Sequence, residues 1–181
     1  MITRSQLKAL QGRAFDLFLT AGLFLTEEER ERIEVADFGL SHAEIEGAQI
    51  FTFVQTDRYA AKIIGLFPGQ TLPEHWHPPV GEDPGKQETV RVAWGQLLLC
   101  AEGADTLLHS RIVRGKEGVY TTRCEFVFRP GDTRTFHPGE KHWFQGGPDG
   151  VVLYSFSSVV RDALDGFSDP AIQRNTRIVE D

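Results

Sequence analysis

The sequence is poor in cysteine, in long apolar runs and in clustered basic residues, and each shortage argues against a class of protein. Cysteine occurs only at Cys100 and Cys124, with no C-x-x-C pair. A disulfide framework or a cysteine-rich zinc site is therefore not expected. Both cysteines lie in apolar, strand-like surroundings, where a small buried thiol is the expected role.

Membrane and nucleic-acid partners are also disfavoured by what is missing. The N-terminal stretch lacks the uninterrupted apolar region of a signal peptide, and no apolar run is long enough to span a bilayer. The 19 basic residues are outnumbered by 26 acidic ones, which gives a formal charge of -7. Because nucleic-acid and anionic-membrane surfaces normally show clustered Lys and Arg, we expect neither partner. The cytoplasm is the expected location.

The length of 181 residues suits one domain, since about 100 to 200 residues per domain is usual. We expect a single domain over residues 1–181, with a helical segment at 1–35 and a β-barrel over about 48–160. The polar tail, 161–181, is expected to wrap the surface or to form an oligomer contact. No internal repeat or low-complexity segment is present.

Two helices are expected near the N-terminus. Thr3 with Gln6, and Thr26 with Glu29, have the spacing of two capping boxes. Gly22 is a plausible stop for the first helix. The apolar positions of this helix share one face: Leu7, Leu10, Ala14, Leu17 and Phe18.

From about Ile50 onward, short β-rich runs are separated by Gly, Pro and Asp clusters. Regularly spaced short strands of this kind predict an all-β sandwich or barrel. The runs are IFTFVQT, AKIIGLF, QTLPEHWH, ETVRVAWGQLLLCA, VYTTRCEFVF, TRTFHP and VVLYSFSSVV.

The segment EHWHPPVGEDPGKQE carries the strongest chemical signal. A strand alternates its faces with a period of two, so His75 and His77 are expected to point the same way. After the turn-rich loop, the same alternation places Glu88 on one face with Lys86, Val90, Val92 and Trp94. Glu88 is therefore a candidate third metal ligand, with Lys86 beside it.

A fourth candidate ligand, His142, follows the turn residues Pro138 and Gly139. A Pro-Gly pair sets a tight turn before a new strand, so His142 is expected at the start of that strand, facing inward. Imidazole and carboxylate donors suit Mn, Fe, Co, Ni or Zn and leave positions open for a chelating substrate. Any one histidine alone would more often be an ordinary hydrogen-bonded residue, and no role is assigned to His42 or His109. His137 is the weaker of the two late candidates, because it precedes the Pro-Gly turn.

These residues resemble the two cupin motifs, in the segments GQTLPEHWH, Glu88 with Gly95, and GDTRTFHPGEKH. The resemblance implies a cupin double-stranded β-barrel, which is jelly-roll-like. The long loop PPVGEDPGKQ, together with TDRYAAK, GKQETVRV and KHWFQGGPDGVV, is similar to the D-lyxose isomerase family. This resemblance extends from about Thr26 to Ile172.

The resemblance implies an aldose-ketose isomerase that uses a divalent metal, typically manganese, to interconvert D-lyxose and D-xylulose. Related sugars such as D-mannose and D-fructose are further candidate substrates. By position, the ligands would be His75, His77, Glu88 and His142. Lys86 and Lys62 match two lysines of the family's site, as a catalytic and a substrate-binding residue. A homodimer is expected by analogy.

One departure from the family affects the mechanism. Isomerisation moves a proton between C1 and C2 of an open-chain sugar and requires a base and a group that stabilises the enediolate. The family carries a glutamate at the position of Ser155, and serine is not a useful base near neutral pH. Lys86, Asp162 and Asp165 are the remaining candidates, although Lys86 could instead hold a sugar oxygen.

Two alternative functions use the same residues. The ligand set would also suit an iron-dependent oxygenase, because an open position on Fe(II) can bind oxygen. A non-catalytic sugar-binding cupin is the second alternative, which the serine at position 155 favours.

Overall fold

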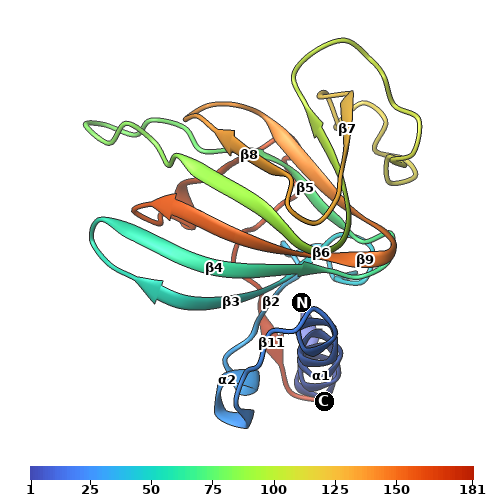
Figure 1. Ribbon diagram of the computed structural model, residues 1–181, viewed down its shortest axis with the longest axis vertical. Coiled ribbons are helices and arrows are strands. Elements are labelled where there is room, and N and C mark those ends of the chain that lie inside the picture. Colours follow the sequence, from blue (N-terminus) through green and yellow to red (C-terminus); the bar gives the residue numbers. More distant parts are fainter.

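A curled antiparallel sheet forms most of the molecule, in a computed structural model that describes residues 1–181 (Figure 1). The sheet has nine strands. The long strand β9 is at its centre and pairs with three others: β4, β5 and β6. The strands are β2 (Glu34–Ala36), β3 (Ala48–Gln55), β4 (Tyr59–Leu66), β5 (Thr71–Trp76), β6 (Glu88–Ala101), β7 (Cys124–Phe128), β8 (Thr133–Phe136), β9 (His142–Ser158) and β10 (Gly166–Phe167). This mostly-β architecture confirms the expected barrel.

A β-bulge in β6 changes which face one predicted residue occupies. The register with β9 shifts between Val92 and Trp94. Val90 and Val92 therefore face the barrel interior, whereas Trp94 packs on the outer face. The prediction that Trp94 shares a face with Glu88 is wrong, because the inserted residue reverses the alternation.

The barrel interior is apolar beneath the candidate site. Alternate residues of the strands point inward, as the period of two requires. Ile64 and Leu66 of β4 lie there, with Leu153 of β9 opposite. Lys62 belongs to the same face of β4 and is buried. An inward-facing lysine in an apolar barrel needs a partner, and the site provides one.

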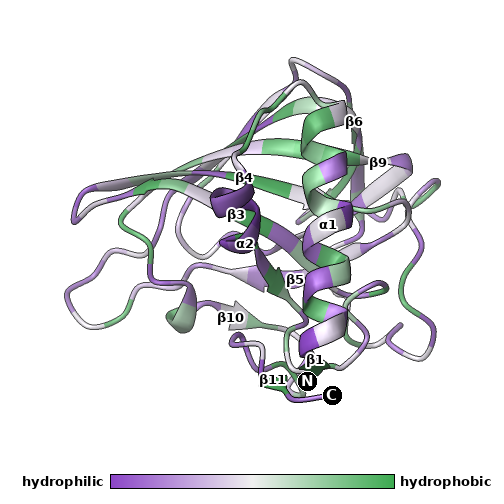
Figure 2. Cartoon of the chain, turned by 90° about the horizontal axis from the view of Figure 1, so that it is seen from below, coloured by the Kyte–Doolittle hydropathy of each residue, from purple (hydrophilic) through white to green (hydrophobic).

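The helix α1 (Arg4–Thr20) covers the outer face of the sheet, as the view from below shows (Figure 2). Its predicted capping box is present, with Thr3 and Gln6 bonded reciprocally. Leu10, Ala14 and Phe18 pack on outward-facing apolar residues of the sheet, in a buried cluster. The short α2 (Glu27–Glu31) has the second predicted capping box. The helix therefore packs on the sheet from outside the barrel.

The predicted strand 119–128 is shorter in the structure, where β7 begins at Cys124. Thr121 and Thr122 instead donate hydrogen bonds to the buried carboxylate of Glu74 through both their backbone N–H groups and their hydroxyls. Ser168 of the tail donates to the same carboxylate. Glu74 therefore fastens the long loop 102–123 and the tail onto β5.

The C-terminal tail does more than wrap the surface. Its strand β10 pairs with β5, where Phe167 lies opposite His75. The last strand, β11 (Ile178–Val179), pairs in parallel with β1 (Ile2–Thr3), so the two ends of the chain lie side by side (Figure 1). The tail thus crosses the end of the barrel that holds the candidate site. The chain contains no helix with both the length and the apolar character that a bilayer crossing requires.

Candidate metal centre and substrate pocket

Three histidines converge where β5 ends and β9 begins. His75 lies opposite His142 in the register of these strands, and their ring centroids are 4.3 Å apart. His77 follows directly after β5, with its ring 5.2 Å from that of His75 and 5.5 Å from that of His142. The candidate ligand atoms lie within 4.8 Å of one another, and all three side chains are buried. The structure thus brings together the three histidines that the sequence singled out.

The Nδ1 atom of each of the three rings has a hydrogen-bond partner outside the cluster. A carbonyl oxygen only accepts, so Nδ1 of His75 donates to Pro73 (2.8 Å) and Nδ1 of His142 to Glu140 (2.9 Å). Nδ1 of His77 is 2.8 Å from the carboxylate of Asp165. Partners of this kind fix the tautomer of a metal-binding histidine. Nε2 of His142 is buried without any partner, which is costly unless a ligand occupies the site.

The protonation states of two rings also suit metal binding. Burial, followed by the charge of neighbouring His77, lowers the pKa of His75 to about 4. Burial, with His75 and His77 beside it, holds the pKa of His142 well below its usual value. Both rings are therefore neutral near pH 7, the form that binds metal. For His77, hydrogen bonds to Asp165 and Glu88 outweigh burial and raise the pKa.

Glu88 lies at the edge of the histidine cluster. Its Oε2 atom is 3.0 Å from Nε2 of His77, and its Oε1 atom accepts a hydrogen bond from Ser155. Burial alone would raise the pKa of Glu88, but Lys86, His77 and Ser155 lower it well below its usual value. A buried, ionised carboxylate beside imidazole nitrogens completes a donor set that fits a divalent ion of the manganese-to-zinc series.

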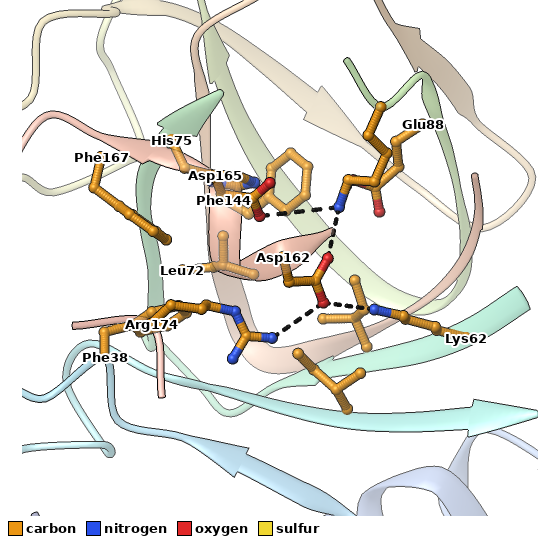
Figure 3. Close-up of a pocket in the computed structure, with 13 residues that line it drawn as sticks. Phe38, Lys62, Leu72, His75, Glu88, Phe144, Asp162, Asp165, Phe167 and Arg174 are labelled. Atoms are coloured by element: carbon orange, nitrogen blue, oxygen red, sulfur yellow. Dashed lines mark hydrogen bonds and ion pairs between the residues drawn. The ribbon is translucent and has the colours of Figure 1, made fainter. Parts of the chain in front are cut away.

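A narrow pocket with a volume of about 40 Å³ adjoins this cluster, and His75 is the one histidine that lines it. Figure 3 shows its polar and apolar walls. The lining residues are Phe38, Ile50, Lys62, Ile64, Leu72, His75, Lys86, Glu88, Phe144, Asp162, Asp165, Phe167 and Arg174. Lys62 and Lys86, the two lysines that the family resemblance singles out, both line this pocket.

Asp162 lies at the centre of the charged groups (Figure 3). Its carboxylate is 2.7 Å from Lys62, 3.1 Å from Lys86 and 3.2 Å from Arg174. Burial opposes ionisation, but these three cations hold the pKa of Asp162 far below its usual value. Asp162 is thus ionised, and it is an acceptor surrounded by donors.

Lys86 is surrounded by carboxylates. Its Nζ atom is 3.4 Å from Glu88, 3.1 Å from Asp162 and 4.0 Å from Asp165. Burial alone would lower the pKa of Lys86, but the three carboxylates raise it above its usual value. Lys86 is therefore a protonated hydrogen-bond donor in this environment.

The tail supplies what sequence reasoning did not find. The sequence suggests Asp162 and Asp165 only as candidate bases, and it does not mark Arg174 as a site residue. No local signal distinguishes Arg174, because the tail lacks periodicity. The side-chain amide of Gln145 is hydrogen-bonded to Thr71 and to the backbone of Arg111.

The remaining histidines lie outside the cluster. His109 and His137 are exposed, and His42 is 3.7 Å from Glu46, a contact that belongs to another part of the molecule.

The chain is similar in sequence to known sugar isomerases. No protein-family model matches the chain. The chain is 48% identical to D-lyxose ketol-isomerase of Cohnella laeviribosi over 163 residues, which cover 90% of each protein. It is 45% identical to D-lyxose/D-mannose isomerase of Thermosediminibacter oceani over 175 residues, covering 96% of this chain and 97% of the relative.

Solved structures with low sequence identity share the fold. L-ribose isomerase of Cellulomonas parahominis has a TM-score of 0.80 at 15% identity, with 98% of each chain covered. L-ribose isomerase of Acinetobacter sp. DL28, in complex with L-ribose, has a TM-score of 0.80 at 16% identity and the same coverage. From its identity to the curated relatives and from its architecture, the chain belongs to the D-lyxose ketol-isomerase family and is an isomerase with the cupin double-stranded β-barrel fold.

Proposed function

We propose that the protein interconverts D-lyxose and D-xylulose in a metal-dependent reaction. The observation that carries this proposal is the cluster of three buried imidazoles with Nδ1 occupied on every ring, beside a pocket lined by charged and apolar side chains. The names of the relatives supply the substrate. One of them acts also on D-mannose by its name, so the pair D-mannose and D-fructose is a second candidate.

His75, His77, His142 and Glu88 would hold the ion. We propose manganese first, with iron, cobalt, nickel and zinc as alternatives, because the donor set suits this whole series. A divalent ion held there would supply Lewis-acid stabilisation of the negative charge that develops on two adjacent substrate oxygens.

Lys86 acts as a donor in this proposal. Of its two candidate roles, base and oxygen-binding residue, the surrounding carboxylates favour the second, because they keep the amine protonated. A protonated amine placed beside the ligand Glu88 can donate hydrogen bonds to the oxygens at C1 and C2. It thereby stabilises the enediolate as charge develops.

Asp165 is our candidate for the proton transfer between C2 and C1. One of its oxygens receives Nδ1–H of His77, whereas the other makes no hydrogen bond within the protein and lies 4.0 Å from Lys86. Asp162 has both oxygens engaged by cations, and both oxygens of Glu88 are also engaged. Of these three carboxylates, Asp165 is the one with an oxygen that makes no hydrogen bond within the protein. It would take the proton from C2 and return it to C1, while the hydroxyl proton moves from O2 to O1.

The test is to strip the protein of metal, add D-lyxose, restore Mn(II), and follow D-xylulose by NMR. Mn-dependent ketose formation is the expected result. A metal-loaded protein that converts no aldose to ketose would overturn the proposal. Oxygen uptake with Fe(II) would then point to the oxygenase alternative, and sugar binding without product would point to a binding protein.

We further propose a homodimer that works in the cytoplasm. The outer face of the sheet beyond α1 carries exposed aromatic side chains, Phe53 of β3, Tyr59 of β4 and Phe156 of β9, each about half exposed. An apolar patch on a sheet is typical of a contact between copies. Light scattering should give twice the monomer mass.

The proposed location rests on the two cysteines. Cys100 and Cys124 are not joined in a disulfide, and free thiols suit a reducing compartment such as the cytoplasm.

A further inference from the structure

The C-terminal tail delivers an arginine into the pocket through fixed backbone contacts. The N–H of Gln173 donates to the carbonyl of Phe38 (2.9 Å), and the Thr176 hydroxyl donates to the carbonyl of Val35 (2.9 Å). Arg174 lies between these two anchors. Only 12% of its side chain is exposed. The tail therefore places a largely buried guanidinium in the wall of this pocket.

Three groups fix the orientation of the Arg174 guanidinium. One edge donates to Glu34 (2.6 Å) and another to Asp162 (3.2 Å). The Phe38 ring lies beneath it, with 5.9 Å between the ring centroid and Cζ. A planar guanidinium held in this way can present its remaining N–H groups to a ligand in one geometry.

Every cation around Arg174 has a carboxylate partner. Arg174 pairs with Glu34 and Asp162, and Lys62 pairs with Asp162. Lys86, the third cation at Asp162, also has Glu88 and Asp165 as partners. No cation is left without a carboxylate, so a phosphate group would find no excess positive charge at this end of the pocket. An uncharged ligand is favoured.

Hydroxyl groups match this arrangement. Each hydroxyl donates one hydrogen bond and accepts others. Here an ionised acceptor, Asp162, lies between two donors, Lys62 and Arg174. Figure 3 shows Lys62 and Arg174 on the side of the pocket away from His75 and Glu88. Apolar walls suited to the C–H edges of a sugar lie close by: Phe38, Ile50, Ile64 and Leu72.

We propose that Lys62, Asp162 and Arg174 form a subsite for the distal hydroxyls of an uncharged, open-chain sugar, and that Arg174 is a specificity-determining residue for the number of carbons. This inference rests on the proposed function in one respect, because that function assigns C1 and C2 to the histidine end. The hydroxyls of C4 and C5, and of C6 in a hexose, then reach Arg174.

The experiment measures binding and turnover separately. Calorimetry on the Mn-loaded protein uses D-arabinitol, which is D-lyxose with C1 reduced and cannot isomerise. Steady-state kinetics use D-lyxose and D-mannose. The variants are Arg174→Met, Arg174→Lys and, as a matched control in the same tail, Arg177→Met, because Arg177 is exposed.

For Arg174→Met we expect the Kd of D-arabinitol and the KM of D-lyxose each to rise about tenfold, the cost of a hydrogen bond to a charged group. The kcat should change by less than about threefold, and the ratio of kcat/KM for D-lyxose and D-mannose should shift about fivefold or more. Arg174→Lys should fall between Arg174→Met and the wild type, and Arg177→Met should match the wild type.

Several results would overturn the subsite. One is a folded Arg174→Met protein with unchanged Kd and unchanged sugar preference. Others are a wild type that binds no D-arabinitol, or one that binds D-ribose 5-phosphate more tightly than D-lyxose. If Arg174→Met does not fold, Glu34→Gln is the substitute variant, because it weakens the hydrogen bond that orients the guanidinium. It should raise the Kd of D-arabinitol about threefold. An unchanged Kd would then overturn the subsite. Binding of D-arabinitol that depends on Arg174, without turnover of either sugar, would refute the proposed function alone.

Discussion

His77 Nδ1 lies 2.8 Å from Asp165 Oδ1, although the two residues are 88 positions apart in the chain. The contact joins the first cupin motif to the C-terminal tail. A carboxylate behind a histidine fixes the ring's orientation and raises its basicity toward a metal. The tail is therefore part of the candidate metal centre, and another of its acidic residues, Asp162, lines the same pocket as Asp165.

Replacing His142 should abolish tight metal binding. Its Nε2 atom is buried and without a partner, so His142→Ala removes one donor from the cluster. Loss of a partner behind a ligand already costs about 10- to 100-fold in metal affinity, and we expect the loss of the ligand itself to cost at least about 100-fold. Elemental analysis after dialysis against Mn(II) measures the effect. His109→Ala changes an exposed histidine and should retain the metal; equal retention in both variants would contradict the assignment.

Replacing Asp165 should separate catalysis from metal binding. In Asp165→Asn the amide oxygen can still accept Nδ1–H of His77, so we expect the metal to remain bound within about tenfold of the wild-type affinity. The proton acceptor is lost, and kcat should fall by about 10² to 10⁴. Asp162→Asn, by contrast, should act mainly on KM. If Asp165→Asn keeps its kcat, the proton acceptor lies elsewhere in the pocket.

Ser155 should support Glu88, since its hydroxyl donates to Oε1 of that carboxylate. Ser155→Ala leaves this buried oxygen without its donor, and we expect Mn(II) affinity to fall about tenfold. Competition with a chelator measures the affinity. Ser157→Ala, two residues further along β9, removes a hydroxyl that makes no hydrogen bond within the protein and is the matched control. An equal effect of both substitutions would show that Ser155 acts only through packing.

Much of this architecture follows from local signals. The run 88–101 coincides with β6 because its β-rich residues are bounded by turns, and α1 begins where its capping box predicts. His75 and His77 point the same way because a strand has a period of two, and His142 follows its Pro-Gly turn as the first residue of β9. Strand periodicity and one turn were therefore sufficient to predict that the three histidines lie together.

The remaining features depend on contacts distant in sequence. Trp94 turns outward because a bulge forms where β6 crosses β9, and at Gly95, with a φ of +76°, a side chain would collide with Gly150. The segment 119–122 has β-forming residues, yet its threonines bind Glu74 and the strand does not extend there. Arg174 enters the pocket through backbone bonds to β2 and its neighbours, for which the tail's own sequence carries no periodic signal.

Phe18 should be a principal contributor to the packing of α1 on the sheet. Its side chain is fully buried, against the backbone of Gly65 among others. Phe18→Ala should lower the free energy of unfolding by about 3–5 kcal/mol, because the helix lies on a rigid sheet and cannot collapse into the space. Urea unfolding monitored by circular dichroism gives the value. Leu19→Ala, at a half-exposed position of the same helix, should cost less than about 1 kcal/mol, and a similar cost for both would contradict the packing described here.

Acid should destabilise the long loop through Glu125. This carboxylate accepts hydrogen bonds from the backbone N–H groups of His109 and Ser110. Burial opposes ionisation, but the bonds to Ser110 and His109 prevail and lower the pKa of Glu125. Because the folded-state pKa lies below the unfolded one, the stabilisation is fully present above the unfolded value, about 4.3. It is lost as the pH falls through the folded value.

The measurement is the free energy of unfolding in urea between pH 6 and 3, for the wild type and for Glu125→Gln. The glutamine variant cannot ionise, so the wild type should lose more stability than the variant on acidification, and the two curves should approach each other below about pH 4. Glu102→Gln, which alters an exposed carboxylate in the loop 102–123, is a control for general charge effects. Parallel curves for wild type and Glu125→Gln would mean that Glu125 has the same pKa in the folded and unfolded chain, and that the loop is held by its neutral hydrogen bonds alone.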